Sequence, residues 1–332
     1  RIIQAAKEQA IAEAGTGIIN RLIAGVVKRP AAFRASQWLA PVVLHYAKGR
    51  EKSSEFTVQS SPGRSIRGQA PYKVRSSKGK SRGKVVFFTG CAVEYFQPEI
   101  GKATIGVLNS IGYDVIVPDG LKCCGRPLLS LGDRAAAEDL AQHNASLLKA
   151  VKADAIVTAC ASCGLTFKKE YPTLLRSGAN APAILDIHEF LASRISGLKL
   201  GPVKKTVTWH DPCHLGRGQG LSGTARDILR AVPGLALEEM RDADRCCGFG
   251  GVMRITHHRL SNGIAKEKAG TIMATKASAV VTGCPGCRMQ IANALNQSGS
   301  RIEVLHTVQI LEEAIGIADC GFEQCGVSKR LS

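Results

Sequence analysis

The strongest constraint on this 332-residue chain is a spacing of cysteines that occurs twice. The first copy reads C-x31-CCG-x34-CxxC and the second reads C-x32-CCG-x35-CxxC, so the two spacings differ by one residue at each step. The residues concerned are Cys91, Cys123, Cys124, Cys160 and Cys163 in the first set, and Cys213, Cys246, Cys247, Cys284 and Cys287 in the second. A single CxxC fits zinc, a redox dithiol or chance. Five cysteines that recur in order predict a duplicated site.

The number of cysteines in each set favours an inorganic cluster over a single metal ion. Twelve cysteines in a chain of this length are too dilute for a small disulfide scaffold, and we expect no cleavable signal peptide before them. Structural zinc needs four ligands, which is one fewer than each set offers. An iron–sulfur centre with several irons can use the fifth thiolate. The sequence therefore favours iron–sulfur over zinc, with disulfides as a remote third reading.

Short β-rich runs alternate with helical runs after Lys84, which predicts parallel sheets flanked by helices. In the first half we expect strands at 85–88, 115–117 and 155–158, and helices at 95–111, 134–152 and 163–174. In the second half we expect strands at 206–209, 235–240 and 279–282, and helices at 221–232, 257–274 and 285–296. The order repeats, so the expected fold is α/β, with two tandem Rossmann-like units.

This fold would gather the cysteines of each half at one edge of a sheet. Four of them follow closely on an expected strand, namely Cys91, Cys160, Cys213 and Cys284. The carboxyl ends of parallel strands share one edge, so the loops should converge on one pocket per half. Each CxxC also opens a helix whose free N–H groups stabilise anionic sulfur. Gly125 and Gly248 would allow a positive φ after each cysteine pair.

The basic residues lie in a different part of the chain from the cysteines. The formal net charge is +17, but residues 1–90 carry 17 Lys and Arg against 4 acidic residues, whereas the remainder carries 27 against 23. The excess positive charge of residues 1–90 therefore indicates a role in docking rather than in the chemistry of the cysteine site. Attraction to nucleic acid is discounted, because no recognition helix or aromatic stacking platform accompanies it. An acidic partner, an anionic membrane or plain solvation of a linker fits better.

The expected organisation has five segments. They are a helical connector at 1–47, a basic flexible linker at 48–83, a first unit at 84–200, a second unit at 201–316 and a tail at 317–332. The chain looks cut from something longer, because apolar residues with helical spacing begin at Ile2 without a cap. No apolar run reaches the ~18 to 20 residues of a spanning helix. We expect the helices of the connector to pack on the body or on a domain upstream, in preference to a peripheral membrane contact through Trp38, Leu39, Val42 and Leu44.

Other residues near the cysteines have competing interpretations. His210 and His214 flank Cys213 and could bind metal, tune a cluster through N–H···S bonds or deliver protons. His188 and His306 favour capping or packing over chemistry. The arginines beside the motifs could bind anions or form ordinary surface ion pairs; they are Arg126, Arg217, Arg245 and Arg288. An auxiliary metal site and no role at all are both open for Cys320 and Cys325. The glycines near the second set favour close loop packing over a dinucleotide fingerprint; they are Gly216, Gly218, Gly220, Gly250 and Gly251.

The motifs resemble those of the CCG (cysteine-rich) domain iron–sulfur family. The resemblance covers about residues 84–316 and is carried by three segments of the second half, His210 to Leu215, Cys246 to Gly251 and Thr282 to Gln290. These look most like the glycolate oxidase and lactate utilisation iron–sulfur subunits, in which a ferredoxin domain precedes a helical connector; the first residues here resemble the start of that connector. Both sets of five are complete, which is similar to the heterodisulfide reductase chain whose noncubane clusters cleave a disulfide.

The resemblance implies a cofactor, partners and a location. The ten repeated cysteines would bind two [4Fe–4S] clusters of the noncubane type, one in each five-cysteine set. Zinc in one half is the alternative. The chain would pass electrons from a flavin-containing dehydrogenase subunit, through an upstream ferredoxin domain or subunit, toward quinone or another carrier. It would be cytoplasmic, with a peripheral position on the inner face of the cytoplasmic membrane as the alternative. A catalytic reductase that cleaves a disulfide is the second reading, and a zinc-bound scaffold is the third.

Overall fold

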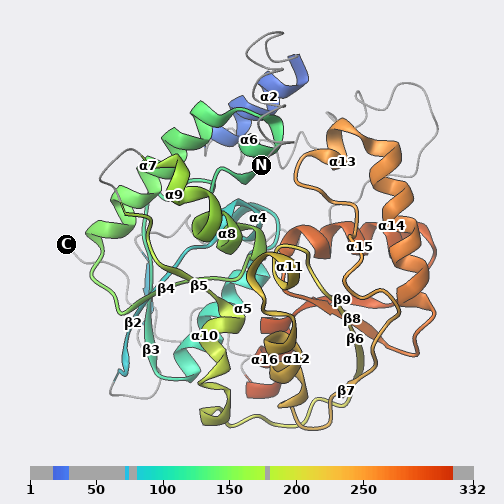
Figure 1. Cartoon of the computed structure of the whole chain (residues 1–332). Coiled ribbons are helices and arrows are strands. Elements are labelled where there is room, and N and C mark those ends of the chain that lie inside the picture. The colour runs from blue at the N-terminus through green and yellow to red at the C-terminus, as the bar shows by residue number, and fades with distance from the viewer. Residues whose placement is uncertain (1–17, 30–71, 75–80, 176–179, 317–332) are drawn as a thin grey trace.

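The computed structural model describes residues 18–29, 72–74, 81–175 and 180–316. Two mainly parallel sheets lie side by side, one in each half of the chain (Figure 1). The first has the order β1 (Tyr72–Val74), β3 (Tyr113–Val117), β2 (Gly83–Phe87), β4 (Ala155–Thr158) and β5 (Ile184–Asp186). The second has the order β7 (Ala236–Leu237), β6 (Thr206–His210), β8 (Ala279–Thr282) and β9 (Glu303–His306). Apart from β1 the two orders match strand for strand, which confirms the duplicated α/β fold.

Helices cover the faces of both sheets and follow the strands in the same sequence in each unit. In the first unit they are α4 (Gly90–Tyr95), α5 (Pro98–Ser110), α6 (Arg126–Leu131), α7 (Arg134–Ala150), α8 (Ala161–Leu165), α9 (Tyr171–Leu174) and α10 (Ile187–Ala192). In the second they are α11 (Gly216–Gln219), α12 (Ser222–Arg230), α13 (Met253–Thr256), α14 (His258–Met273), α15 (Pro285–Gln297) and α16 (Thr307–Ile315). A 3-10 turn, η3 (Ile195–Gly197), leads from the first unit toward the second.

Strands β5 and β9 were not among the predicted strands, and three other elements also differ from the sequence prediction. Strand β1 lies inside the segment expected to be a linker and pairs antiparallel with β3. Strand β7 has two residues instead of the expected six, because it is an edge strand that pairs only with β6. The helix expected at 163–174 is divided by a π turn, η2 (Thr166–Glu170). Pro172 follows this turn and has no N–H to continue the α-helical ladder, which explains the change of register.

The first sheet buries both of its faces, as parallel sheets between helices do. Val85 and Phe87 point to one side of β2 and join the larger hydrophobic cluster. Val86 and Phe88 point to the other side and join a second cluster beneath α6 and α7. The larger cluster also contains Trp209 and the core of the second sheet, so the two units share one continuous apolar interior.

Helix α2 (Ile18–Lys28) belongs to the expected connector and packs against the first unit beside α6 and α7 (Figure 1). Ala24 and Val27 are buried there, and Lys28 Nζ lies 3.5 Å from the carboxylate of Asp133. This part of the connector therefore packs on the body. The segment from Trp38 to Leu44 lies outside the described residues, as do Cys320 and Cys325. Within the described ranges no helix is long and apolar enough to cross a membrane.

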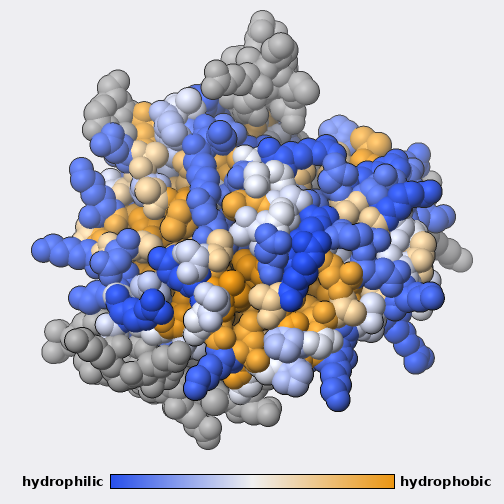
Figure 2. Space-filling model, turned by 60° about the horizontal axis from the view of Figure 1, so that its bottom comes forward, coloured by the Kyte–Doolittle hydropathy of each residue, from blue (hydrophilic) through white to orange (hydrophobic). Residues whose placement is uncertain are grey.

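Apolar residues reach the surface on one face of the molecule. In the view from below (Figure 2), hydrophobic residues gather near the middle with hydrophilic residues around them. Large apolar side chains that are clearly exposed number only four among the described residues, namely Leu22, Ile255, Leu260 and Met273. Much of the apolar area in Figure 2 therefore consists of side chains that are partly buried against the core.

The two units are joined by helices that pack across the boundary between them. Helix α5 packs on α16, α10 on α12, and α4 on α15. Arg288 of the second unit places Nη1 2.7 Å from Glu99 Oε1 and 2.7 Å from Gln97 Oε1 of the first. Its Nε donates to the Val304 carbonyl at 2.8 Å, so one guanidinium holds a strand of its own unit and a helix of the other.

We expect Arg288→Ala to lower the free energy of unfolding by about 2 kcal/mol, because it removes charge-assisted hydrogen bonds from a mostly buried site. Arg230→Ala is the matched control, since the Arg230–Asp227 ion pair is exposed and should contribute about 0.5 kcal/mol or less. Urea unfolding followed by tryptophan fluorescence measures both. Equal effects of the two substitutions would contradict a stabilising role of Arg288 at the boundary.

Candidate metal centre

All ten repeated cysteines lie beyond the carboxyl ends of three neighbouring strands in each unit. Cys91 is in α4 after β2, the Cys123–Cys124 pair follows β3, and Cys160 and Cys163 stand at the start of α8 after β4. Their counterparts follow β6, β7 and β8 in the same way, with Cys284 at the N-cap of α15. In each unit the central strand has a neighbour on both sides. The loops beyond the carboxyl ends of these strands are the usual place of a site in a doubly wound sheet.

The five thiols of the first set form a connected group. The Sγ atoms of Cys91 and Cys123 are 3.5 Å apart. Cys123 also interacts with Cys124, Cys124 with Cys163, and Cys163 with Cys160. Four of the five are buried and Cys91 is half-buried, so this set faces the interior with one edge toward solvent.

The second set has the same connectivity. Cys213 interacts with Cys246, Cys246 with Cys247, and Cys247 with Cys287, which in turn interacts with Cys284. The backbone N–H of Gly248 donates to Cys246 Sγ at 3.3 Å. Here Cys213 and Cys246 are half-buried and the other three are buried. The second set is therefore the more open of the two.

The two sets touch, although the sequence predicted a separate pocket in each half. The thiols of Cys160 and Cys284 interact directly across the boundary between the units. Ser162 Oγ lies 3.6 Å from Cys284 Sγ and 2.8 Å from His214 Nδ1. Ser162 was not among the predicted site residues, although it stands inside the first CxxC where the second has Gly286. The ten sulfurs thus form one continuous array.

Crowding sets the protonation of these thiols. Hydrogen bonds from Cys123 and Cys163 lower the pKa of Cys124, and those from Cys160 and Cys287 lower the pKa of Cys284. In contrast, hydrogen bonding to a neighbouring thiol together with burial raises the pKa of Cys123, Cys163 and Cys287. Adjacent sulfurs cannot all be charged in a buried space unless cations replace their protons. The donor set therefore fits a polynuclear metal group, with five soft ligands per unit.

The histidines beside Cys213 lie in different surroundings. One ring nitrogen of His210 lies within 4.8 Å of both Cys247 Sγ and Cys287 Sγ, and burial lowers the pKa of His210 to about 3. Burial also lowers the pKa of His214, whose ring reaches across to Ser162. Both imidazoles therefore border the array, His210 inside the second set and His214 at the contact between the two sets.

The expected capping or packing role is confirmed for both His306 and His188, the first as a cap and the second as a buried packing residue. His306 caps α16, where its ring accepts from the N–H of Val308 at 3.3 Å. Helix α10 is capped by Asp186 instead. The His188 ring bridges Asp186 Oδ1 at 2.7 Å and Thr307 Oγ1 at 2.8 Å, and this second contact crosses to the other unit. His188 is thus a buried link between the units.

The arginines beside the cysteine motifs all pair with carboxylates. The pairs are Arg126 with Glu170, Arg217 with Asp244, Arg245 with Glu267 and Arg288 with Glu99. Ordinary ion pairing therefore accounts for all four positions. Four of the five glycines expected to pack loops closely do so. A Cβ would lie 2.7 Å from Asp211 Oδ1 on Gly216, 2.8 Å from Leu165 on Gly218, 2.8 Å from Met253 on Gly250 and 2.7 Å from Ser130 on Gly251. The prediction is wrong for Gly220, because a Cβ there would meet nothing within 4 Å.

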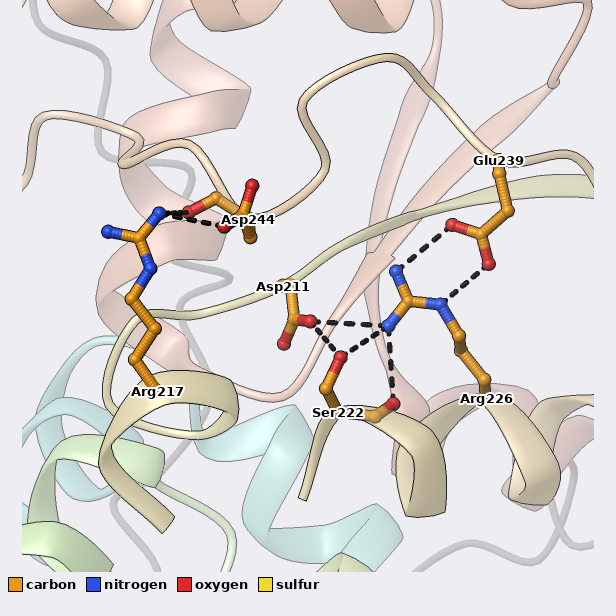
Figure 3. A network of polar contacts seen from close by, with 6 residues as sticks. All are labelled: Asp211, Arg217, Ser222, Arg226, Glu239 and Asp244. Carbon is orange, nitrogen blue, oxygen red and sulfur yellow. Dashed lines mark hydrogen bonds and ion pairs between the residues drawn. The ribbon is translucent and has the colours of Figure 1, made fainter. Parts of the chain in front are cut away.

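A polar network fixes the loop that carries Cys213 (Figure 3). Arg226 on α12 binds both oxygens of Glu239 at 2.6 and 3.0 Å and reaches Asp211 Oδ2 at 3.2 Å. Ser222 donates to the same Asp211 oxygen. Asp211 is 5% exposed and stands two residues before Cys213, so Arg226 ties this ligand loop to a helix. The neighbouring Arg217–Asp244 pair lies on the surface.

The comparisons with known proteins agree with this geometry. A family model described as a cysteine-rich domain, CCG, matches residues 85–168 and 207–292. One chain of the fumarate reductase (CoM/CoB) of Methanothermobacter marburgensis is 41% identical over 240 residues, which are 72% of this chain and 48% of that protein. One chain of the dihydromethanophenazine:CoB–CoM heterodisulfide reductase of Methanosarcina barkeri is 31% identical over 252 residues, 73% of this chain and 61% of that one.

A shorter relative matches almost from end to end. Lactate utilization protein A of Bacillus cytotoxicus is 29% identical over 237 residues, which are 69% of this chain and 98% of that protein. The chain spans about half the length of the curated relative with the highest of these identities. A solved structure of a hypothetical protein from Helicobacter pylori has a TM-score of 0.57 at 9% identity, covers 91% of this chain and 60% of that one, and supports the fold alone.

The glycines of the two CCG motifs should differ in their tolerance of a side chain. Both have positive φ, +92° for Gly125 and +85° for Gly248, so alanine at either position costs about 1 kcal/mol of strain. A Cβ on Gly248 would lie 2.5 Å from the Ser261 carbonyl, whereas the nearest atoms to one on Gly125 lie at 3.5 Å. We therefore expect Gly248→Ala to lower the free energy of unfolding by about 3 kcal/mol in total. Urea denaturation of the two variants checks the order, and a more damaging Gly125→Ala would contradict it.

Proposed function

Because the chain belongs to the CCG cysteine-rich domain family, we propose that it is the iron–sulfur electron-transfer subunit of a larger oxidoreductase. The observation that carries the proposal is the continuous array of ten thiols, five from each unit. Five thiols exceed the four that a structural zinc site uses. A cluster in each set, of the noncubane [4Fe–4S] type, would use all five, and a bound cluster supplies a one-electron carrier.

The residues around each set support this role. Cys160 and Cys284 stand at the N-cap positions of α8 and α15, where the helix dipole favours negative charge, and the backbone N–H of Cys287 helps to lower the pKa of Cys284. The contact between these two cysteines offers a direct route from one set to the other. Cys91 and Cys213 are half-buried, so each set has an edge from which a partner can deliver or remove electrons.

For the whole complex we propose a glycolate- or lactate-type dehydrogenase. In this complex a flavin subunit would oxidise the 2-hydroxy acid, and electrons would reach this chain through a ferredoxin domain or subunit and leave toward quinone or another carrier. The near-complete match to a lactate utilization protein supports this choice. The basic N-terminal quarter suits docking to an acidic partner or to the inner face of the membrane.

Disulfide reduction is the second candidate, and two observations favour it. Both five-cysteine sets are complete, and the second set is open at Cys213 and Cys246. Two of the relatives, one of them 41% identical, bear names that refer to CoM and CoB. In this reaction a disulfide would take up two electrons and two protons and leave as two thiols.

The direct test is the metal content of anaerobically purified or reconstituted protein. We expect about four irons and four sulfides per set and a brown colour. Cys123→Ser should abolish the cluster of the first set, because Cys123 contacts two other thiols of that set. Cys320→Ser, outside both sets, is the matched control and should leave iron and sulfide unchanged. Stoichiometric zinc without sulfide would overturn both redox functions in favour of a scaffold.

The two redox candidates differ in what reoxidises the reduced protein. We expect a quinone analogue to reoxidise it, and the CoB–CoM heterodisulfide to have no effect on its visible spectrum under anaerobic conditions. Rapid reoxidation with release of two thiols per disulfide would favour the reductase instead.

A further inference from the structure

One difference between the two cysteine sets is the residue that borders each set at the carboxyl end of the central strand. Phe88 stands three residues before Cys91, and His210 stands three residues before Cys213. The Phe88 ring packs edge-on against Phe167 with centroids 4.9 Å apart. His210 is 1% exposed, and one of its ring nitrogens lies within 4.8 Å of both Cys247 Sγ and Cys287 Sγ. The first set therefore meets an apolar ring where the second meets an imidazole.

The His210 ring has no competing hydrogen-bond partner in the described part of the chain. Both of its nitrogens are buried without a partner. The Ala243 backbone lies near the ring but outside hydrogen-bonding geometry. A buried N–H without a partner is costly, and the sulfurs of Cys247 and Cys287 are the acceptors at hand. A hydrogen bond from this ring to cluster sulfur would supply the missing interaction.

A buried lysine adds a second difference between the sets. Lys268 on α14 is 1% exposed, and its Nζ donates to the Asp242 carbonyl at 2.5 Å. Its charge acts on both Cys247 and His210. Asp242 and Asp244 attract it only from a distance, since no carboxylate among the described residues lies within 4.0 Å of it in an ion pair. Burial lowers the pKa of Lys268, whereas negative charge on Cys247 and on the more distant Asp242 and Asp244 raises it. The Lys268 ammonium is therefore coupled electrostatically to the second set.

The first unit has a neutral residue at the corresponding place. Gly125 lies against Ala137 of α7, and Gly248 lies against Ser261 of α14, which aligns the two helices. In this alignment Lys268 corresponds to Asn144, an amide that binds the Lys122 and Cys123 backbone. Arg126 lies near the first set, but it is partly exposed and paired with Glu170 at 3.0 Å. The first set therefore has no buried counterpart to the Lys268 charge at this place.

Cations and N–H donors near a buried cluster stabilise its reduced form, which is the more negative one, and so raise its reduction potential. We propose that His210 and Lys268 hold the reduction potential of the second set above that of the first, so that the second set is the electron-accepting end of this chain. The inference rests on the proposed electron-transfer function. An electron supplied by the reduced flavin of a partner subunit would leave the first set, which is oxidised by one electron, and reduce the second across the Cys160–Cys284 contact.

The test is an anaerobic redox titration of the reconstituted protein, followed by low-temperature electron paramagnetic resonance. Cys124→Ser and Cys287→Ser assign each midpoint to its set. We expect the higher midpoint in the second set. His210→Phe introduces the residue of the first unit, and Lys268→Met removes the buried charge. Each should lower the midpoint potential of the second set by about 59 mV, which is a tenfold change in the equilibrium constant for one-electron transfer between the sets. The midpoint of the first set should stay unchanged.

Two controls separate tuning from loss of structure. Lys266→Met removes a charge from the exposed side of the same helix and should move neither midpoint. His210→Gln keeps an N–H donor and should retain a larger part of the potential than His210→Phe. Equal midpoints in loaded protein, or shifts no larger than that of Lys266→Met, would overturn the inference alone. Wild-type protein without iron and sulfide would overturn the proposed function and this inference with it.

Discussion

The main physical constraint on the site is the crowding of ten sulfurs at the boundary between the two sheets. Each unit brings five thiols to the carboxyl ends of its strands, and the two groups meet where Cys160 contacts Cys284. Buried thiols at such distances cannot all ionise beside one another, because each negative charge raises the pKa of its neighbours. Metal cations remove this conflict by replacing the protons. Metal binding at this boundary would therefore tie both halves together as well as create the redox site.

Duplication gives the two units the same framework but not the same chemistry. The strand order and the cysteine positions match, while the residues that border the sets do not. Phe88 and Asn144 in one unit correspond to His210 and Lys268 in the other. Two identical carriers would share an electron equally, whereas two carriers in different electrostatic surroundings give it a direction. In the proposed electron transfer, these differences between the repeats would decide which set holds the electron.

Much of the fold could be read from local patterns. The strands at 155–158 and 279–282 coincide with β4 and β8, and the helix expected at 134–152 ends within two residues of α7. These elements have strong periodicity and clear ends. The failures have local causes: Pro172 changes the helix after the first CxxC, and β7 is an edge strand whose length depends on one neighbour. Strand β1 was missed because it lies in a basic, polar segment and exists through its pairing with β3.

The sequence by itself determined that there are two five-cysteine sets on a repeated α/β framework, because spacing and periodicity are properties of a chain read in order. It could not show that the sets touch, that Ser162 links Cys284 to His214, or that Lys268 is buried beside the second set. The first two facts depend on how the units pack across α5, α16, α10 and α12, which brings together Ser162 and Cys284 from 122 positions apart. The third depends on packing within the second unit, where Lys268 contacts Asp242. Tertiary packing therefore turned two predicted pockets into one array.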